Sequence, residues 1–157
     1  MILTIDDWIF DIDTEKTREH SSFALQTHCT CGYCENYYRA VEIVCPDLRA
    51  FLARFLVEIE GPSEMYPFEP TLCLLGYKVF GRILRFGREP LMVGGIPVMP
   101  EPREDGLFML EVGELTLPWL LNEDMDEVVS PANEPEYLEN MYRVMLRRGY
   151  FTDLLPS

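Results

Sequence analysis

The spacing of apolar residues changes from helical to extended near residue 71, and this change constrains the fold more than any other feature. Within residues 1–60 apolar positions recur at helical spacing, most clearly at Leu48, Phe51, Leu52, Phe55 and Leu56. After residue 71 the pattern becomes extended, and short turns separate four apolar segments at 72–75, 78–86, 91–99 and 107–117. Helical segments followed by consecutive strands are typical of an α+β protein with an antiparallel sheet.

We therefore expect a single α+β domain over residues 1–157. A first strand followed by helices fills 1–60, and an antiparallel sheet of about four to six strands spans 71–121. A C-terminal helix at 134–149, with acidic residues toward its start and arginines at its end, is expected to pack on the sheet. Residues 61–71 contain three prolines and are expected to form a connecting loop.

The N-terminal segment and the second helix give more detailed expectations. Trp8, Phe10 and Ile12 alternate with more polar positions, which indicates an extended arm with one apolar face. Asp47 precedes the clearest helical pattern in the chain, and aspartate is a favoured N-cap residue. We therefore expect the side chain of Asp47 to cap that helix.

The glycines and the last apolar segment of the sheet region also carry predictions. A turn is expected at Gly76, whereas Gly94 and Gly95 lie within a strand pattern and indicate a bulge or a close approach of another backbone. The segment 117–121 is expected to leave the sheet and to pack Trp119 into the core.

One short segment holds three of the five cysteines and one of the two histidines, and it is the most unusual part of the chain in composition. Cys29, Cys31 and Cys34 surround a turn, and zinc prefers four such ligands in a tetrahedron. The candidates for the fourth ligand are His28, His20 and Cys45. We take Cys29, Cys31, Cys34 and His28 as the candidate zinc site. However, His28 adjoins Cys29, and the chain lacks the two separated cysteine pairs of a typical zinc knuckle.

Two other interpretations of these cysteines stay open. A helix that begins near Cys31 aligns four residues along one face, namely Cys34, Tyr38, Val41 and Cys45. Because buried cysteine packs as a small apolar residue, the cysteines are then core residues and no cofactor is required. Alternatively, Cys31 and Cys34 have the spacing of reactive thiols at a helix N-terminus, although the strand–helix–strand context of a thioredoxin-like domain is missing around them.

The charge of the chain restricts its partners. It carries 27 acidic and 13 basic side chains, which give a formal net charge of −14. Such a surface repels nucleic acids and anionic membranes and attracts a basic protein partner, although acidity also keeps many proteins soluble without a dedicated partner. Because no apolar run is long enough to cross a bilayer and the N-terminus lacks export-signal features, we expect a cytoplasmic protein with reduced thiols.

Three motifs carry a resemblance to a family. They are Trp8-x-Phe10-Asp11-x-Asp13-x-Glu15-Lys16-Thr17-Arg18, Cys29-x-Cys31-x-x-Cys34-x-Asn36-Tyr37-Tyr38 and Leu117-Pro118-Trp119-Leu120-Leu121. The chain resembles a family of small bacterial proteins of unknown function that carry a Cys-x-Cys-x-x-Cys-x-Asn motif. The resemblance implies an intracellular bacterial protein without an assigned activity, and it transfers no catalytic residue.

The sequence leaves the function unknown and favours two classes. The first is a non-enzymatic interaction or accessory protein whose acidic surface binds a basic protein partner. The alternative is a zinc-binding or thiol-dependent protein centred on Cys29, Cys31 and Cys34. Neither histidine lies in a recognisable hydrolase motif and no nucleotide-binding loop is found, so the sequence assigns no catalytic residue.

Overall fold

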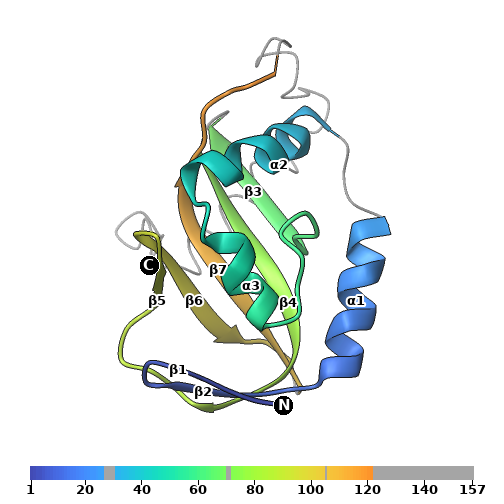
Figure 1. The fold of residues 1–157 in the computed structure, drawn as a ribbon, viewed down its shortest axis with the longest axis vertical. Helices are drawn as coiled ribbons and strands as arrows, with labels where there is room; N and C mark the ends of the chain where they lie inside the picture. Colours follow the sequence, from blue (N-terminus) through green and yellow to red (C-terminus); the bar gives the residue numbers. More distant parts are fainter. Residues whose placement is uncertain (27–30, 70–71, 105, 122–157) are drawn as a thin grey trace, which may run out of the picture.

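The computed structural model describes residues 1–26, 31–69, 72–104 and 106–121 (Figure 1). These residues form three α-helices and a seven-stranded antiparallel sheet, so the predicted α+β class is confirmed. The helices are α1 (Thr14–Gln26), α2 (Gly32–Val44) and α3 (Leu48–Arg54). The strands are β1 (Ile2–Ile5), β2 (Trp8–Ile12), β3 (Glu64–Glu69), β4 (Leu72–Arg85), β5 (Leu91–Val93), β6 (Ile96–Pro102) and β7 (Leu107–Thr116).

The long strand β4 is the centre of the sheet. The strand order is β1-β2-β4-β7-β6-β5, and β3 also pairs with β4. One edge of β4 pairs with β7, whereas the other edge pairs with β3 near its start and with β2 near its end. Helices α2 and α3 lie over one face of this sheet, and α1 stands beside β4 (Figure 1).

The sheet has more strands than the expected four to six because it takes in two further segments. The predicted loop at 61–71 contains β3, which pairs with the first half of β4. Pro67 fits there because, among the described strands, β3 pairs with β4 alone, and an edge strand tolerates the missing N–H of proline. The N-terminal arm adds the other segment, a hairpin of two strands.

The alternation expected in the N-terminal arm is confirmed, since Trp8, Phe10 and Ile12 are all buried. The arm is divided, however, by a tight turn at Asp6 and Asp7 that reverses the chain between β1 and β2. Asp6 has a φ of 51°, in the left-handed region that aspartate tolerates better than most residues. The turn therefore leaves two adjacent carboxylates exposed at the end of the hairpin.

The roles predicted for the glycines are wrong at two places. No turn occurs at Gly76, and β4 continues through it. A Cβ at that position would lie 2.7 Å from Cε of Met109, so glycine makes room for a neighbouring strand. Gly94 and Gly95 form the turn between β5 and β6 rather than a bulge, with φ values of 55° and 82° that suit glycine.

Side-chain hydroxyls bind the backbone groups in the middle of one β4 edge, where neither β2 nor β3 pairs with this strand. The Lys78 N–H donates to Oγ of Ser63 at 3.2 Å, and the Phe80 N–H donates to Oγ1 of Thr17 at 3.1 Å. The Thr17 hydroxyl in turn donates to the Phe80 carbonyl at 3.2 Å. Thr17 is buried, so these two hydrogen bonds between Thr17 and Phe80 fix α1 against the edge of β4.

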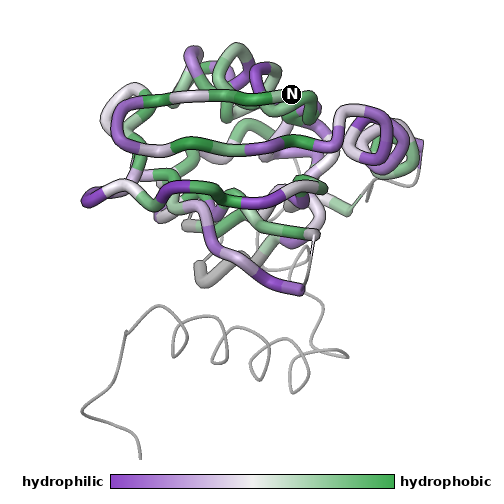
Figure 2. The backbone as a smooth tube through the Cα atoms, turned by 90° about the horizontal axis from the view of Figure 1, so that it is seen from below, coloured by the Kyte–Doolittle hydropathy of each residue, from purple (hydrophilic) through white to green (hydrophobic). Residues whose placement is uncertain are grey.

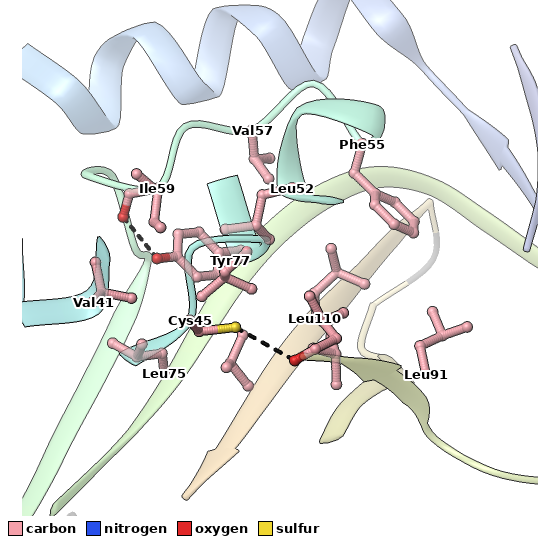
Figure 3. Close-up of a cluster of buried hydrophobic side chains, with 14 of the residues drawn as sticks. Val41, Cys45, Leu52, Phe55, Val57, Ile59, Leu75, Tyr77, Leu91 and Leu110 are labelled. Carbon is pink, nitrogen blue, oxygen red and sulfur yellow. Dashed lines mark hydrogen bonds between the residues drawn. The ribbon is translucent and has the colours of Figure 1, made fainter. Parts of the chain in front are cut away.

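The core lies between the sheet and the two helices α2 and α3 (Figure 3). The helix expected near Cys31 is confirmed, with Cys34, Val41 and Cys45 buried and Tyr38 partly buried against the core. The Cys45 thiol, which lies at the end of α2, donates to the Val93 carbonyl at 3.4 Å. This contact joins α2 to the edge strand β5.

The second predicted helix is confirmed as α3, but the expected side-chain cap is not formed. Asp47 occupies the N-cap position with φ −81° and ψ −12°, and its side chain makes no capping hydrogen bond. A capping side chain normally needs an extended backbone at this position, whereas Asp47 already has helical angles. Burial of Leu48, Leu52 and Phe55 therefore holds α3 in place.

Two expectations concern the end of the chain. The C-terminal helix predicted at 134–149 lies outside the described residues. Trp119, which was expected in the core, is only half-buried. The backbone groups of its neighbours Pro118 and Leu120 are hydrogen-bonded to Asn36 of α2. None of the described helices is long and apolar enough to span a membrane.

Candidate functional site

The structure places two of the four candidate zinc ligands on the first turn of α2. Cys31 is the N-cap residue, with an extended backbone (φ −64°, ψ 163°) and an exposed side chain. Cys34 lies one turn later and is only 8% exposed, with its Sγ 3.8 Å from Sδ of Met65. His28 and Cys29 lie outside the described residues. The two described thiols therefore differ sharply in their access to solvent.

The zinc interpretation remains a prediction. Among residues 1–26, 31–69, 72–104 and 106–121, no group of three or more His, Cys, Asp or Glu side chains is placed to hold a metal ion. The core interpretation is confirmed for Cys34 and Cys45, and Cys73 in β4 is buried as well. Burial raises the pKa of Cys45 and raises that of Cys73 to about 12, so both remain protonated thiols at neutral pH.

A buried asparagine joins α2 to the segment that follows β7. Asn36 donates from Nδ2 to the Pro118 carbonyl at 3.0 Å and accepts at Oδ1 from the Leu120 N–H at 2.7 Å. The Asn36 side chain thus bonds to one carbonyl and one N–H of this segment, as the backbone of a neighbouring strand would. Asn36 belongs to the cysteine motif of the sequence, and Pro118 and Leu120 belong to its late motif, so the two motifs meet in space.

A pair of buried tyrosines forms the polar centre of the core. The hydroxyls of Tyr37 on α2 and Tyr77 on β4 are hydrogen-bonded. Tyr77 in turn donates to the Ile59 carbonyl at 2.7 Å (Figure 3). Burial raises the pKa of both phenols, and for Tyr37 the neighbouring Tyr77 raises it further. Both hydroxyls are therefore protonated near neutral pH, and the pair holds α2 on the sheet.

His20, the other described candidate ligand, lies on α1 beside the edge of β4. Its Nε2 is 3.2 Å from Oγ of Ser63, the same oxygen that accepts from the Lys78 N–H. Burial, together with the positive charge of Lys78, lowers the pKa of His20. Ser63 already accepts a hydrogen bond from the backbone of β4. The contact between His20 and Ser63 is therefore explained by the packing of α1 against this strand, without a catalytic role.

The sequence did not reveal a hollow beside the β1–β2 turn, whose volume is about 310 Å³. It is lined by Asp6, Asp7, Trp8, Arg88, Glu89, Pro90 and Met92. We call it the hairpin hollow. Three carboxylates and one guanidinium thus surround it, which gives the lining an excess of negative charge.

The wall of the hairpin hollow is fixed by Trp8. Its indole N–H donates to the Glu89 carbonyl at 2.9 Å, across 81 positions of sequence. Gly87 lies so close that a Cβ there would stand 2.1 Å from Nε1 of Trp8. The loop between β4 and β5 is therefore held directly against β2.

Large exposed apolar side chains line the hairpin hollow or pack against its wall. Phe86 is 57% exposed with its ring centroid 5.8 Å from that of Trp8, and Met92 is 61% exposed. Apolar and acidic groups therefore lie together at this end of the molecule. In the sequence, this arrangement is indicated only by Asp6 and Asp7, which precede the aromatic residue Trp8. Nothing in that pattern shows that residues 86–92 lie next to them.

The comparisons with known proteins supply no relative from which a function could be transferred. A scan against protein-family models matched no family, and searches of curated proteins and of solved structures returned no match.

Proposed function

We propose that the protein is a non-enzymatic interaction module that binds a basic protein partner at the hairpin hollow. The observation that supports this proposal is the combination of Asp6, Asp7 and Glu89 with the exposed apolar side chains of Phe86 and Met92. Interfaces with basic partners use this pairing, because apolar burial supplies affinity and carboxylates supply selectivity and steering.

Acidity alone does not distinguish the hairpin hollow from the rest of the surface. Exposed carboxylates also lie on α1 and α2, for example Glu15, Glu19 and Glu42. Glu42 is already paired with Arg49. The hairpin hollow differs in its concave shape and in the apolar groups at its border, which are the features expected where a partner side chain is to be buried.

The proposal can be tested with a short synthetic peptide of alternating lysine and valine as the basic probe. Affinity is measured by calorimetry for the wild type and for the double variant Asp6→Asn/Asp7→Asn. Asparagine tolerates the positive φ of Asp6, so the turn is kept. We expect a loss of about tenfold, from two carboxylates that each contribute a fraction of a kcal/mol or more.

The matched control is Glu15→Gln/Glu19→Gln, which removes the same charge from exposed positions on α1. We expect this variant to bind the peptide nearly as well as the wild type. An equal loss in both variants would mean that the peptide senses net charge alone, and no binding to the wild type would also contradict the proposal.

A second candidate function follows from the thiols of α2. We propose it as reversible thiol–disulfide exchange, because exposed Cys31 at a helix N-terminus and buried Cys34 one turn later have the arrangement of an attacking and a resolving cysteine. Cys31 would attack a disulfide of the partner and release one thiol. Cys34 would then attack Sγ of Cys31 and release the second thiol, so two electrons pass to the partner.

The exchange reaction is tested by incubation with oxidised glutathione followed by mass spectrometry. We expect a Cys31–Cys34 disulfide, two mass units lighter than the dithiol, and we expect Cys34→Ser to accumulate a stable glutathione adduct on Cys31. If the wild type forms neither species, the thiol function is excluded.

A further inference from the structure

Strand β1 is one end of the sheet in the part of the chain that the structure describes, and it is short and apolar. The strand order ends at β1, which pairs on one side with β2. Its sequence, Ile-Leu-Thr-Ile, contains neither a charge nor a proline, two of the devices that block pairing at a sheet edge. Figure 2 views the molecule from the end where β1 and β2 lie side by side.

The register of the hairpin identifies the backbone groups of β1 that point outward. Met1 and Ile12 exchange two hydrogen bonds, from Ile12 N–H to Met1 O at 2.8 Å and from the Met1 amino group to Ile12 O at 2.9 Å. In an antiparallel pair, hydrogen-bonded and non-hydrogen-bonded positions alternate. Ile2 and Thr4 are therefore the non-hydrogen-bonded positions opposite Asp11 and Ile9, and their N–H and C=O groups face away from β2.

The outward-facing edge leads directly to the hairpin hollow. β1 ends at Ile5, and the next two residues are Asp6 and Asp7, which line the hollow. A segment that pairs with β1 would thus extend past these carboxylates. Ile2 is 61% exposed and Thr4 is exposed, so no other described part of the chain covers these two positions of the edge.

We propose that β1 is a strand-addition site that takes an extended basic segment of a partner protein. This inference rests on the proposed function and specifies how the partner is held. Main-chain hydrogen bonds to Ile2 and Thr4 would bind the segment, and its lysine or arginine side chains would meet Asp6 and Asp7. Charge selects this occupant over a second copy of the chain, because two molecules that each carry −14 repel one another.

The test is Thr4→Pro, which removes the outward N–H of Thr4 and leaves the hydrogen bonds between β1 and β2 in place. Its control is Thr4→Val, which keeps the N–H and suits a strand. With the lysine–valine peptide, we expect Thr4→Pro to weaken binding about tenfold or more, because a carbonyl of the peptide loses its donor. Thr4→Val should bind like the wild type.

A measurement on the wild type covers the case in which Thr4→Pro fails to fold. Amide hydrogen exchange is followed by NMR with and without the peptide, and we expect slower exchange at Ile2 and Thr4 in the complex. A peptide that binds through Asp6 and Asp7 but leaves these two amides unprotected, or that binds Thr4→Pro as tightly as Thr4→Val, would overturn strand addition while keeping the proposed function. If the peptide does not bind the wild type at all, both strand addition and the proposed function are overturned.

Discussion

Asn36 accepts a hydrogen bond from the backbone N–H of Leu120 at 2.7 Å, although 84 positions separate the two residues in sequence. The same amide donates to the Pro118 carbonyl at 3.0 Å, and the Asn36 side chain is 1% exposed. One side chain therefore fixes the segment after β7 to the helix that carries the cysteines. Leaving this buried amide unpaired would cost free energy of folding. The two hydrogen bonds therefore favour a single position of the segment against α2.

We predict that Asn36→Ala lowers the free energy of unfolding by about 2 kcal/mol, because it removes two hydrogen bonds and leaves a small cavity. Urea denaturation followed by circular dichroism measures the change. Arg39→Ala, at an exposed position of the same helix, is the control and should change stability by less than about 0.5 kcal/mol. Equal stabilities of the two variants would contradict the role of Asn36.

We predict that stability falls as the pH rises above about 9 and falls more steeply above about 10. Tyr37 and Tyr77 have native pKa values raised above the ordinary value of 10.0, so the unfolded chain loses these protons first and alkali favours unfolding. Each group adds up to about 1.4 kcal/mol per pH unit to this decline. Cys73, with its pKa raised to about 12, adds to the loss above its ordinary value of 9.0.

The tyrosine contribution is isolated by measuring urea unfolding at several alkaline pH values for the wild type and for Tyr37→Phe/Tyr77→Phe. The double variant should be less stable at neutral pH, because the Ile59 carbonyl loses its donor. Its stability should decline less steeply in alkali. Parallel profiles for the two proteins would show that these phenols are not responsible.

The sequence predicted those parts of the fold that depend on local periodicity. The helices at Cys31 and Leu48 and the buried face of Trp8, Phe10 and Ile12 follow from the spacing of apolar residues. It could not predict β3, because the three prolines of residues 61–71 indicate a loop and only pairing with β4 makes part of that segment a strand.

Local periodicity predicts even less of the candidate site than of the fold. The burial of Cys34 followed from its place on the helix stripe, whereas the exposure of Cys31 depends on where the helix begins. The hairpin hollow brings Asp6 and Asp7 next to residues 86–92, which are distant in sequence. Such a juxtaposition is set by the strand order, and no local pattern encodes it.

We predict that Gly87→Ala destabilises the protein by about 1–3 kcal/mol, because the new Cβ would overlap the indole of Trp8 and force the loop away. Tryptophan fluorescence during urea unfolding, measured in a Trp119→Phe background that leaves Trp8 as the one indole, reports both the stability and the local change. Arg88→Ala, at the exposed neighbouring position, should leave stability nearly unchanged. A stable Gly87→Ala variant with native fluorescence would show that the close packing is not required.

We predict that Cys31 reacts rapidly with an aromatic disulfide reagent in the native protein, whereas Cys34, Cys45 and Cys73 react only on the timescale of unfolding. Cys31→Ser should remove one thiol from the fast phase, and Cys34→Ser should leave its amplitude unchanged. Elemental analysis of the same sample tests the alternative of zinc bound by Cys29, Cys31, Cys34 and His28. Labelling of Cys31 that becomes fast only after a chelator is added would favour zinc and contradict this prediction.

The most direct test of the proposed function is a map of the contact surface by NMR. The lysine–valine peptide is titrated into labelled wild-type protein, and the amide resonances that shift are assigned. The account predicts that the largest shifts fall in residues 2–8 and 86–92, around the hairpin hollow and the edge of β1. Shifts spread over the acidic surface of α1 and α2, with none concentrated at the hairpin, would contradict it.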